Sequence, residues 1–332
     1  MRALSLFAQS VLLPLVIGLA VLWMVSRGLS GSWAIILMVA GIDVILAVSL
    51  NVVNGFTGQF SIGHAGFMAV GAYTAAKITM ALRGVQILGL SAAISDQVFF
   101  FFALAAGMVA AAIAGLLVGI PSLRLRGDYL AIVTLGFNEI IRVIIENTKF
   151  LGQATGISGL PPLTNFVWVG MGAIATVMMA KRLVGSTHGR ALLAIREDEV
   201  AAEAMGVNTT GYKVRAFVIA SSFAGLAGGL LVHLLQLCTP RSFTFIKSFE
   251  VVVMVVLGGL GSITGSIVAA LGLRIALEGL REFAEYRMVL YALLLIVLML
   301  ARPTGLFGTR EIWDMLPKFL RRRPEPAAGG TP

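Results

Sequence analysis

Charged residues are scarce in this chain of 332 residues. Asp, Glu, Lys and Arg make up 12% of it, about half of their usual share in soluble domains, whereas hydrophobic residues make up 58%. This balance excludes an ordinary soluble domain. It indicates an all-α polytopic membrane protein, because each helix satisfies its own backbone groups in lipid.

Cysteine and histidine are also nearly absent. The single cysteine, Cys238, lies in an apolar run, so a disulfide framework and a thiolate metal site are both excluded, and we interpret it as a small packing residue. The three histidines, His64, His188 and His233, are too scattered in the sequence to indicate a metal site. We expect this chain to bind no metal or cofactor.

Catalytic signatures are missing as well. No lysine follows a glycine, so the GxxxxGK[ST] loop that cradles ATP phosphates does not occur. There is no HExxH, and Ser61 lies in GQFSIG rather than in a GxSxG elbow. An enzyme would have to rest on His64 with Ser61 or Asp43 inside the membrane. That remains an alternative with little support.

Long apolar runs dominate what is present. Windows of about 20 residues that suit a membrane span recur along the chain. We expect ten spans, at residues 7–26, 33–53, 61–82, 98–119, 129–145, 166–182, 214–237, 249–260, 262–280 and 287–301. The first could instead be a secretory signal peptide, but its length and the membrane-like sequence after it favour a retained helix.

Basic residues set the expected orientation. The net charge is +9, and Lys and Arg collect at span ends and in the tail rather than in a basic–aromatic patch, so nucleic acid is not expected as a partner. The basic tail should remain cytoplasmic, as should Arg2. The number of crossings is then even, which requires a break at the glycine-rich residues 258–262. We expect a membrane domain at residues 1–302 and a cytoplasmic tail at 303–332.

One polar passage interrupts the apolar runs. GRALLAIREDEVAAEAMGVN, residues 189–208, carries too much charge for a bilayer core and should form a helix in water. Its three acids at 197–199 suit a helix N-terminus, and Gly206 suits a C-terminal stop. Within the expected cytoplasmic loop 183–213, this helix is best suited to docking a cytoplasmic partner.

The passage NVVNGFTGQFSIGHAGFMAVG, residues 51–71, places polar side chains and five glycines at membrane depth or its edge. Irregular backbone there is tolerated where it lines a cavity or is buried in protein. Two interpretations remain open, a segment that lines a translocation pathway and a tight cytoplasmic turn between two spans. The pathway candidates, including two weaker ones on the fifth span, are Asn51, Asn54, Gln59, Ser61, His64, Thr134 and Asn138.

Other membrane-depth charges favour structural roles. Asp43 should face the bundle, pair or be protonated, and a role in translocation is a weaker alternative to hydrogen bonding between helices. Glu139, Arg142 and Glu146, at i, i+3 and i+7, are spaced to form a ladder on one helix face, and Arg274, Glu278 and Arg281 follow the same logic at i, i+4 and i+7. The GxxxG pairs at 115/119, 225/229 and 261/265 predict close helix packing.

Four stretches resemble the permease subunits of branched-chain amino acid ABC importers, in particular the M-type (LivM-like) partner of that heterodimeric pair. They are SLNVVNGFTGQFSIGHAGFMAVGAYTAA, RLRGDYLAIVTLGFNEIIRVIIEN, GRALLAIREDEVAAEAMGVNTTGYKVRAFVIASSFAGLAGGL and VVVMVVLGGLGSITGSIVAALGL. They occur in family order, within a superfamily that also includes simple-sugar permeases. The first two stretches carry the resemblance to amino acid permeases. GQATGISGLPPL, residues 152–163, is a shifted version of the family's outside loop.

The resemblance implies an ABC importer permease fold in the bacterial inner membrane, with both termini cytoplasmic. It implies a sister H-type permease, two cytoplasmic ATPase subunits that hold ATP and Mg²⁺, and a periplasmic binding protein. It also implies an EAA-like coupling helix. The residues that we expect to couple to the ATPases are Arg196, Glu197, Asp198, Glu199, Ala202, Glu203 and Gly206.

The function expected from the sequence is ATP-driven import of branched-chain amino acids by alternating access. The alternatives are an ABC permease for urea, short amides or simple sugars, and a stand-alone channel or secondary transporter.

Overall fold

The computed structural model describes residues 31–85, 91–123, 129–279, 296, 300 and 305–308. Helices account for most of these residues, as expected. The α-helices are α3 Gly31–Asn51, α4 His64–Ala81, α5 Ala92–Ser122, α6 Tyr129–Asn147, α7 Phe166–Gly185, α8 Thr187–Glu197, α9 Glu199–Ala204, α10 Thr209–Leu235, α11 Phe245–Gly258 and α12 Ile263–Gly279. The shorter elements are the π-helical turn η2 Val52–Phe56, the 3₁₀ turns η3 Lys149–Leu151, η4 Gln153–Thr155 and η5 Pro240–Phe243, and the strands β1 Ile157–Ser158 and β2 Leu237–Cys238.

The expected spans two to nine each coincide with a helix. Four helices in the described part of the chain are long and apolar enough to cross a membrane, namely Gly31–Phe56, Ile94–Ser122, Phe166–Gly185 and Thr209–Leu235. The remaining helices at expected spans, α4, α6, α11 and α12, are shorter, more polar or more charged. The first expected span lies outside the described residues, and the tenth contributes only residues 296 and 300.

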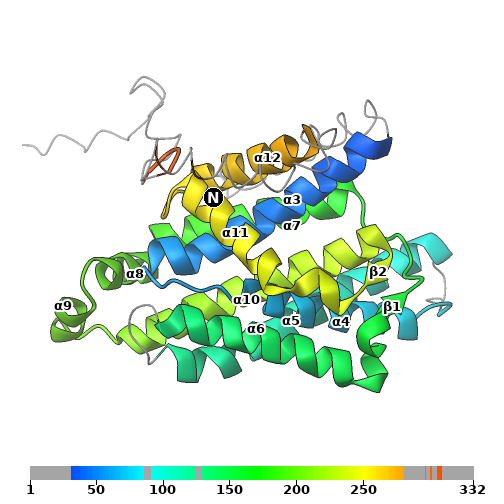
Figure 1. Ribbon diagram of the computed structural model, residues 1–332, viewed down its shortest axis with the longest axis horizontal. Helices are drawn as coiled ribbons and strands as arrows, with labels where there is room; N and C mark the ends of the chain where they lie inside the picture. Colours follow the sequence, from blue (N-terminus) through cyan, green and yellow to red (C-terminus); the bar gives the residue numbers. More distant parts are fainter. Residues whose placement is uncertain are drawn as a thin grey trace, which may run out of the picture.

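The helices form two groups that meet along α10 and α3. Helix α10 packs extensively against α4 and α5, and α6 covers α4 (Figure 1). Helix α3 packs against α10, and also against α7, α11 and α12, which make up the second group. The fully buried residues of α3 and α10 therefore join the two groups in one continuous core.

Three glycines let α4, α5 and α10 approach one another closely. A Cβ on Gly71 would lie 2.2 Å from Gly225 Cα, and a Cβ on Gly225 would lie 2.8 Å from the Gly107 carbonyl oxygen. A Cβ on Gly107 would in turn lie 2.8 Å from the Gly71 carbonyl oxygen. Backbone atoms of a neighbouring helix thus lie close to the Cβ position of each glycine. Small residues permit this kind of close contact between helices in lipid.

This three-glycine contact predicts that substitutions at different glycines differ greatly in their effect on stability. We expect Gly71→Leu to destabilise the detergent-purified chain by about 1–3 kcal/mol or more, because overpacking forces the backbones apart. Gly136→Leu on α6 is the matched control, since a Cβ there would meet no atom within 4 Å. Thermal unfolding followed by size-exclusion chromatography measures both. Equal melting temperatures for the two variants would contradict the close contact.

The glycine-rich break after α11 is confirmed. Helix α11 ends at Gly258 and α12 begins at Ile263, with Gly261 at a φ of +89° between them. The expectation that Gly261 and Gly265 share a helix face was wrong, because Gly261 belongs to the turn. Residues 305–308 lie against this break, where Leu306 N donates to the Leu257 carbonyl at 2.8 Å.

A small sheet departs from the all-helical expectation. Strands β1 and β2 pair antiparallel, with Ile157 opposite Cys238. The backbone of the loop 152–163 therefore pairs with the chain that follows α10. Cys238 is fully buried, which agrees with its interpretation as a packing residue. Its carbonyl accepts a hydrogen bond from the Tyr73 hydroxyl at 3.3 Å.

Candidate coupling and pathway site

The polar passage 189–208 forms two helices rather than the single helix that we expected. The break falls at Asp198, whose backbone is extended. Its carboxylate accepts hydrogen bonds from Val200 N at 2.8 Å and Ala201 N at 3.0 Å, which makes it the N-cap of α9. An aspartate that captures backbone N–H groups in this way competes with the helix that precedes it. Gly206 follows α9 at a φ of +83°.

The inner face of α9 is tied to the start of α10. Lys213 Nζ lies 2.5 Å from Glu199 Oε2, and the lysine side chain is 4% exposed. The Thr209 hydroxyl donates to Glu203 Oε1 at 2.7 Å, and Ala202 is buried. Three of the expected coupling residues, Glu199, Ala202 and Glu203, therefore hold α9 in place on the bundle.

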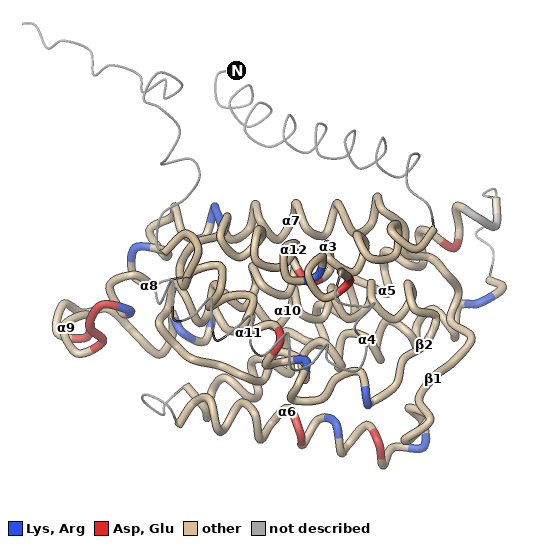
Figure 2. Tube along the Cα trace, turned by 45° about the horizontal axis from the view of Figure 1, so that its top comes forward, with Lys and Arg blue, Asp and Glu red and all other residues tan. Residues whose placement is uncertain are grey.

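The outer face of α9 is exposed and partly apolar. Val200 is 62% exposed and Met205 is 84% exposed. Glu197 and Asp198 are also exposed, and Glu203 is exposed apart from its bond to Thr209, so acids are close in sequence to the two apolar side chains. Helix α9 projects from one end of the helix bundle, and acidic residues mark it in Figure 2. An apolar centre with a polar rim is typical of a protein-binding surface.

The passage after α3 closes on itself as a turn. Asn54 Nδ2 donates to the Ser61 carbonyl at 3.3 Å, and Ser61 N donates to Asn54 Oδ1 at 3.1 Å. The Thr57 hydroxyl donates to the Val53 carbonyl, and Gly58 has a φ of +68°. Asn54 and Ser61 thus satisfy each other, which is the contact that the tight-turn interpretation predicts.

Asn51 connects this turn to the break after α11. Its Nδ2 donates to the Ser262 carbonyl at 2.9 Å and to Ser266 Oγ at 3.0 Å. Its Oδ1 accepts from Gly261 N at 3.0 Å. The Asn51 amide is therefore fully used in joining α3 to α12.

His64 and Thr134 lie at two further contacts of this segment. His64 Nε2 lies 2.9 Å from Ser49 Oγ, so the start of α4 contacts α3. Thr134 on α6 accepts a hydrogen bond from Ile62 N at 3.1 Å. Both side chains are buried, and each fixes the chain between Gly58 and α4 against a neighbouring helix.

Gln59 and Asn138 differ from the other pathway candidates. Gln59 Oε1 and Asn138 Oδ1 are buried, and neither accepts a hydrogen bond from another described residue. Asn138 Nδ2 has a long contact of 3.4 Å to Glu139 Oε1. A buried acceptor without a donor is costly unless water or a ligand supplies one. These two amides therefore remain candidates for contact with water or a solute.

Arg196, at the end of α8, reaches both glycine turns. A Cβ on Gly58 would lie 3.1 Å from Arg196 Cγ, and a Cβ on Gly261 would lie 2.5 Å from Arg196 Nη1. The two turns also touch, since a Cβ on Gly55 would lie 2.3 Å from Gly261 N. Glycine at these positions leaves room for the arginine and for the close approach of the two backbones. Arg196, from the loop 183–213, thus contacts both of the turns that interrupt the helices.

A buried ionic cluster surrounds Asp43. Its side chain is 1% exposed, and Lys247 Nζ lies 3.1 Å from Asp43 Oδ1. Arg274 Nε donates to Asp43 Oδ2 at 2.7 Å. Lys247 also lies 3.3 Å from Glu250. The charges of these four residues cancel, so Asp43 is paired, which is one of the three outcomes that we expected.

The two expected charge ladders have different outcomes. On α6, Arg142 lies 2.7 Å from Glu139 and 2.5 Å from Glu146, which confirms the first ladder. Arg274 contacts Asp43 on another helix, a partner that the spacing along its own helix does not predict, and the second ladder stays a prediction. Arg281 lies outside the described residues. No group of three or more metal-ligating His, Cys, Asp or Glu side chains occurs among the described residues.

Comparisons with known proteins agree with this architecture. The family model for the permease component of branched-chain amino acid transport systems matches residues 32–300. The chain is 38% identical to the high-affinity branched-chain amino acid transport system permease protein LivM of Salmonella typhimurium, over 91% of this chain and 76% of LivM. It is 37% identical to LivM of Escherichia coli K12 over the same shares. It is 26% identical to LivH of that organism, over 81% of this chain and 92% of LivH.

No solved structure gives a significant match. The family model nevertheless covers most of the chain, and the described part contains several membrane-length helices. The chain is therefore a multi-pass membrane protein that belongs to the family of branched-chain amino acid transport permeases.

Proposed function

We propose that this chain is a transmembrane permease subunit of an ABC importer that carries branched-chain amino acids across the bacterial inner membrane. Membership of the permease family and the similarity to LivM and LivH support this proposal. LivM and LivH are both permeases, so a sister H-type subunit is the natural partner in the membrane. Two ATPase subunits supply ATP hydrolysis, and a periplasmic binding protein delivers the amino acid.

The proposed mechanism rests on one observation, the contacts of Arg196 with two glycine turns. The exposed face of α9 offers a docking surface for an ATPase subunit, and the inner face is tied to α10 through Glu199 and Lys213. Arg196 contacts the turns at Gly58 and Gly261. Movement of α8 and α9 is therefore passed to two interruptions in the bundle, where the backbone has fewer helical hydrogen bonds to resist it. Alternating access would follow from rocking of the spans around these turns.

The pathway assignment rests on two buried amides. Among the described residues, Gln59 Oε1 and Asn138 Oδ1 are the buried side-chain acceptors without a hydrogen-bond partner. We propose these two as residues that contact the moving solute or its water. Asn51, Asn54, Ser61, His64 and Thr134 hold the surrounding backbone, because their side chains or main chains are already bonded to neighbours.

The full topology in this proposal has ten crossings. The loop 183–213 and both termini would lie in the cytoplasm, in keeping with positive-inside sorting. Residues 305–308 pack against the end of α11, close to the Gly259–Gly261 turn. The start of the C-terminal tail and the α8–α9 loop thus meet the same region of the bundle. ATP and Mg²⁺ would bind only to the partner ATPases.

Uptake into proteoliposomes tests the function. The complete complex, with its binding protein and internal ATP, should accumulate labelled leucine, and a hydrolysis-deficient ATPase should abolish accumulation. Urea, acetamide or glucose in excess should not compete. ATP-independent uptake by the purified chain would instead support a channel or secondary transporter, and competition by urea or a sugar would support the rival cargoes.

The docking surface of α9 makes a separate prediction. We expect Met205→Asp to reduce the amount of ATPase that co-purifies by about tenfold, because an exposed apolar side chain at the centre of a protein contact can contribute about 1–2 kcal/mol. Leu237→Asp is the control, since Leu237 is 43% exposed and lies after the other end of α10. Undiminished ATPase recovery with Met205→Asp would place the docking surface elsewhere.

A further inference from the structure

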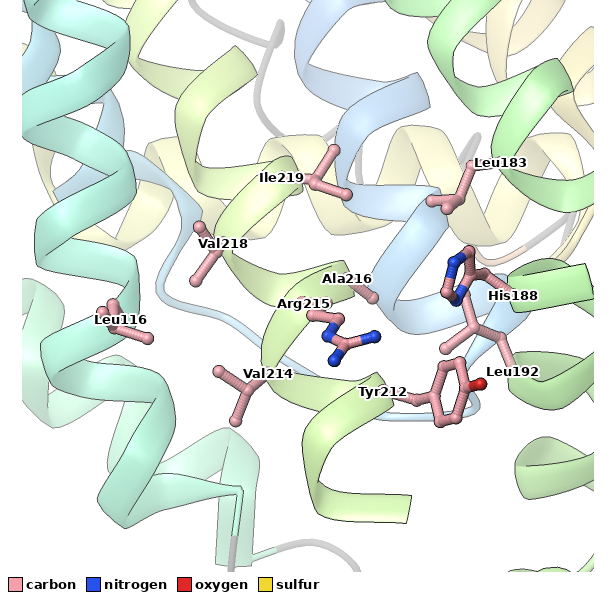
Figure 3. Close-up of a pocket in the computed structure, with 10 residues that line it drawn as sticks. All are labelled: Leu116, Leu183, His188, Leu192, Tyr212, Val214, Arg215, Ala216, Val218 and Ile219. Carbon is pink, nitrogen blue, oxygen red and sulfur yellow. The ribbon is translucent and has the colours of Figure 1, made fainter. Parts of the chain in front are cut away.

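A separate apolar groove lies where α5, α7, α8 and α10 meet. Its volume is about 410 Å³. Figure 3 shows side chains from these helices around a common space, with Arg215 and Tyr212 on α10 and His188 on α8. The apolar part of the lining includes Leu116, Leu183, Leu192, Val218 and Ile219. Almost all of this surface is aliphatic or aromatic.

The groove lies where the ends of the long helices meet the loop 183–213, called the polar loop below. Leu116 is near the end of α5, Leu183 is near the end of α7, and Tyr212 to Ile219 form the first turns of α10. Helix α8 contributes His188 and Leu192 from the polar loop. In the topology proposed above, a groove at this position would face lipid tails on its apolar side and lipid headgroups at its polar end.

Among the described residues, Arg215 at this groove has an aromatic neighbour but no anionic partner. Arg215 is exposed, and its guanidinium contacts the Tyr212 ring at 5.7 Å. In the described part of the chain, that guanidinium donates no hydrogen bond and forms no ion pair. The His188 ring lies 5.5 Å from the same tyrosine ring. An arginine carries five N–H donors, so this cluster can bind an anionic oxygen above the apolar surface.

We propose that this groove binds an anionic phospholipid, with an acyl chain along the aliphatic residues and the phosphate at Arg215 and His188. The charge of the lining is complementary to a phosphate, because it includes the cation Arg215 and no Asp or Glu. A basic, partly apolar site between helix ends is the arrangement that recognises a lipid headgroup. Placing the lipid in the cytoplasmic leaflet rests on the proposed function.

The groove connects the lipid to the coupling elements. Its lining includes α8, which carries Arg196 at its other end, and α10, which pairs with α9 through Lys213. A bound acyl chain would therefore pack between the spans and the loop that we propose to receive the ATPase movement. Such a lipid would stabilise the position of α8 against α10.

Native mass spectrometry of the full-length chain in detergent tests this site. Titration with phosphatidylglycerol should show tighter binding than titration with phosphatidylcholine. Arg215→Gln should weaken phosphatidylglycerol binding by about fivefold, since one arginine near a headgroup contributes about 1 kcal/mol. Ile219→Trp should fill the groove and reduce retention of both lipids. Lys149→Gln, an exposed lysine outside the groove, removes the same charge and should have no effect.

Equal binding of the two lipids would overturn the proposal, as would unchanged phosphatidylglycerol binding by Arg215→Gln. Cross-linking of a cysteine at position 219 to the sister permease would show that a protein fills the groove, and would also overturn it. These readouts need no transport. Lipid selectivity without ATP-driven uptake would therefore support the lipid site and contradict the proposed function. ATP-driven uptake without lipid selectivity would support the proposed function and contradict the lipid site.

Discussion

Replacing Asp43 by alanine is expected to remove most of the folded protein from detergent extracts. The carboxylate is buried between Lys247 and Arg274, and its loss leaves Arg274 without its described ion-pair partner at membrane depth. Removing one partner of a buried ion pair costs about 3–5 kcal/mol, which is a large share of the stability of a typical domain. Lys247 retains its contact with Glu250, so the loss falls mainly on Arg274.

Two controls separate this effect from a general loss of charge. Glu146→Ala also removes a carboxylate from an arginine, but that pair is partly exposed and should contribute about 1 kcal/mol or less. A double variant, Asp43→Leu with Arg274→Leu, should recover part of the yield because no buried charge is left unpaired. Normal yield and melting temperature for Asp43→Ala would show that the cluster does not hold α3, α11 and α12 together.

The Arg196→Ala variant should separate ATP hydrolysis from transport. The substitution removes the guanidinium beside Gly261 and the Cγ beside Gly58, while the exposed face of α9 stays intact. We expect the ATPases to remain bound and active. Leucine uptake per ATP hydrolysed should fall by about tenfold, at the upper end of the coupling energies that single residues carry.

Arg190→Ala is the matched control for this variant. Arg190 lies on the same helix and is exposed, so its removal changes the net charge equally. Uptake and hydrolysis should both stay close to those of the unmodified complex. If Arg196→Ala instead lost the ATPases, Arg196 would belong to the docking surface. If its uptake were unchanged, the two glycine turns would not receive the movement through this side chain.

Features that depend on neighbouring residues were predicted well from the sequence. The GGLGS break was placed correctly because clustered glycines and a charge constraint both required an interruption, and α11 indeed ends at Gly258. The α6 ladder followed from helical spacing alone. The break of the polar loop at Asp198 had a signal in the sequence, since an aspartate before EVAA is a typical N-cap, but the long run of helix-forming residues obscured it.

Contacts between distant residues could not be predicted in this way. Asn51 bonds to Gly261 and Ser262, which lie about two hundred positions later in the chain. Arg274 pairs with Asp43 on another helix, because tertiary packing brings a buried carboxylate within reach. The link from Arg196 to both glycine turns has the same origin. These contacts changed the interpretation of the pathway candidates, most of which proved to be held by partners.

The most direct test of the coupling account is the side of the membrane on which α9 lies. A Met205→Cys substitution in a Cys238→Ala background gives one exposed thiol, because Cys238 is the sole natural cysteine of the chain and is buried. A membrane-impermeant maleimide should label this thiol in inside-out vesicles and not in intact spheroplasts. Labelling in spheroplasts alone would place α9 on the periplasmic face, beyond the reach of any cytoplasmic ATPase, and would contradict the account.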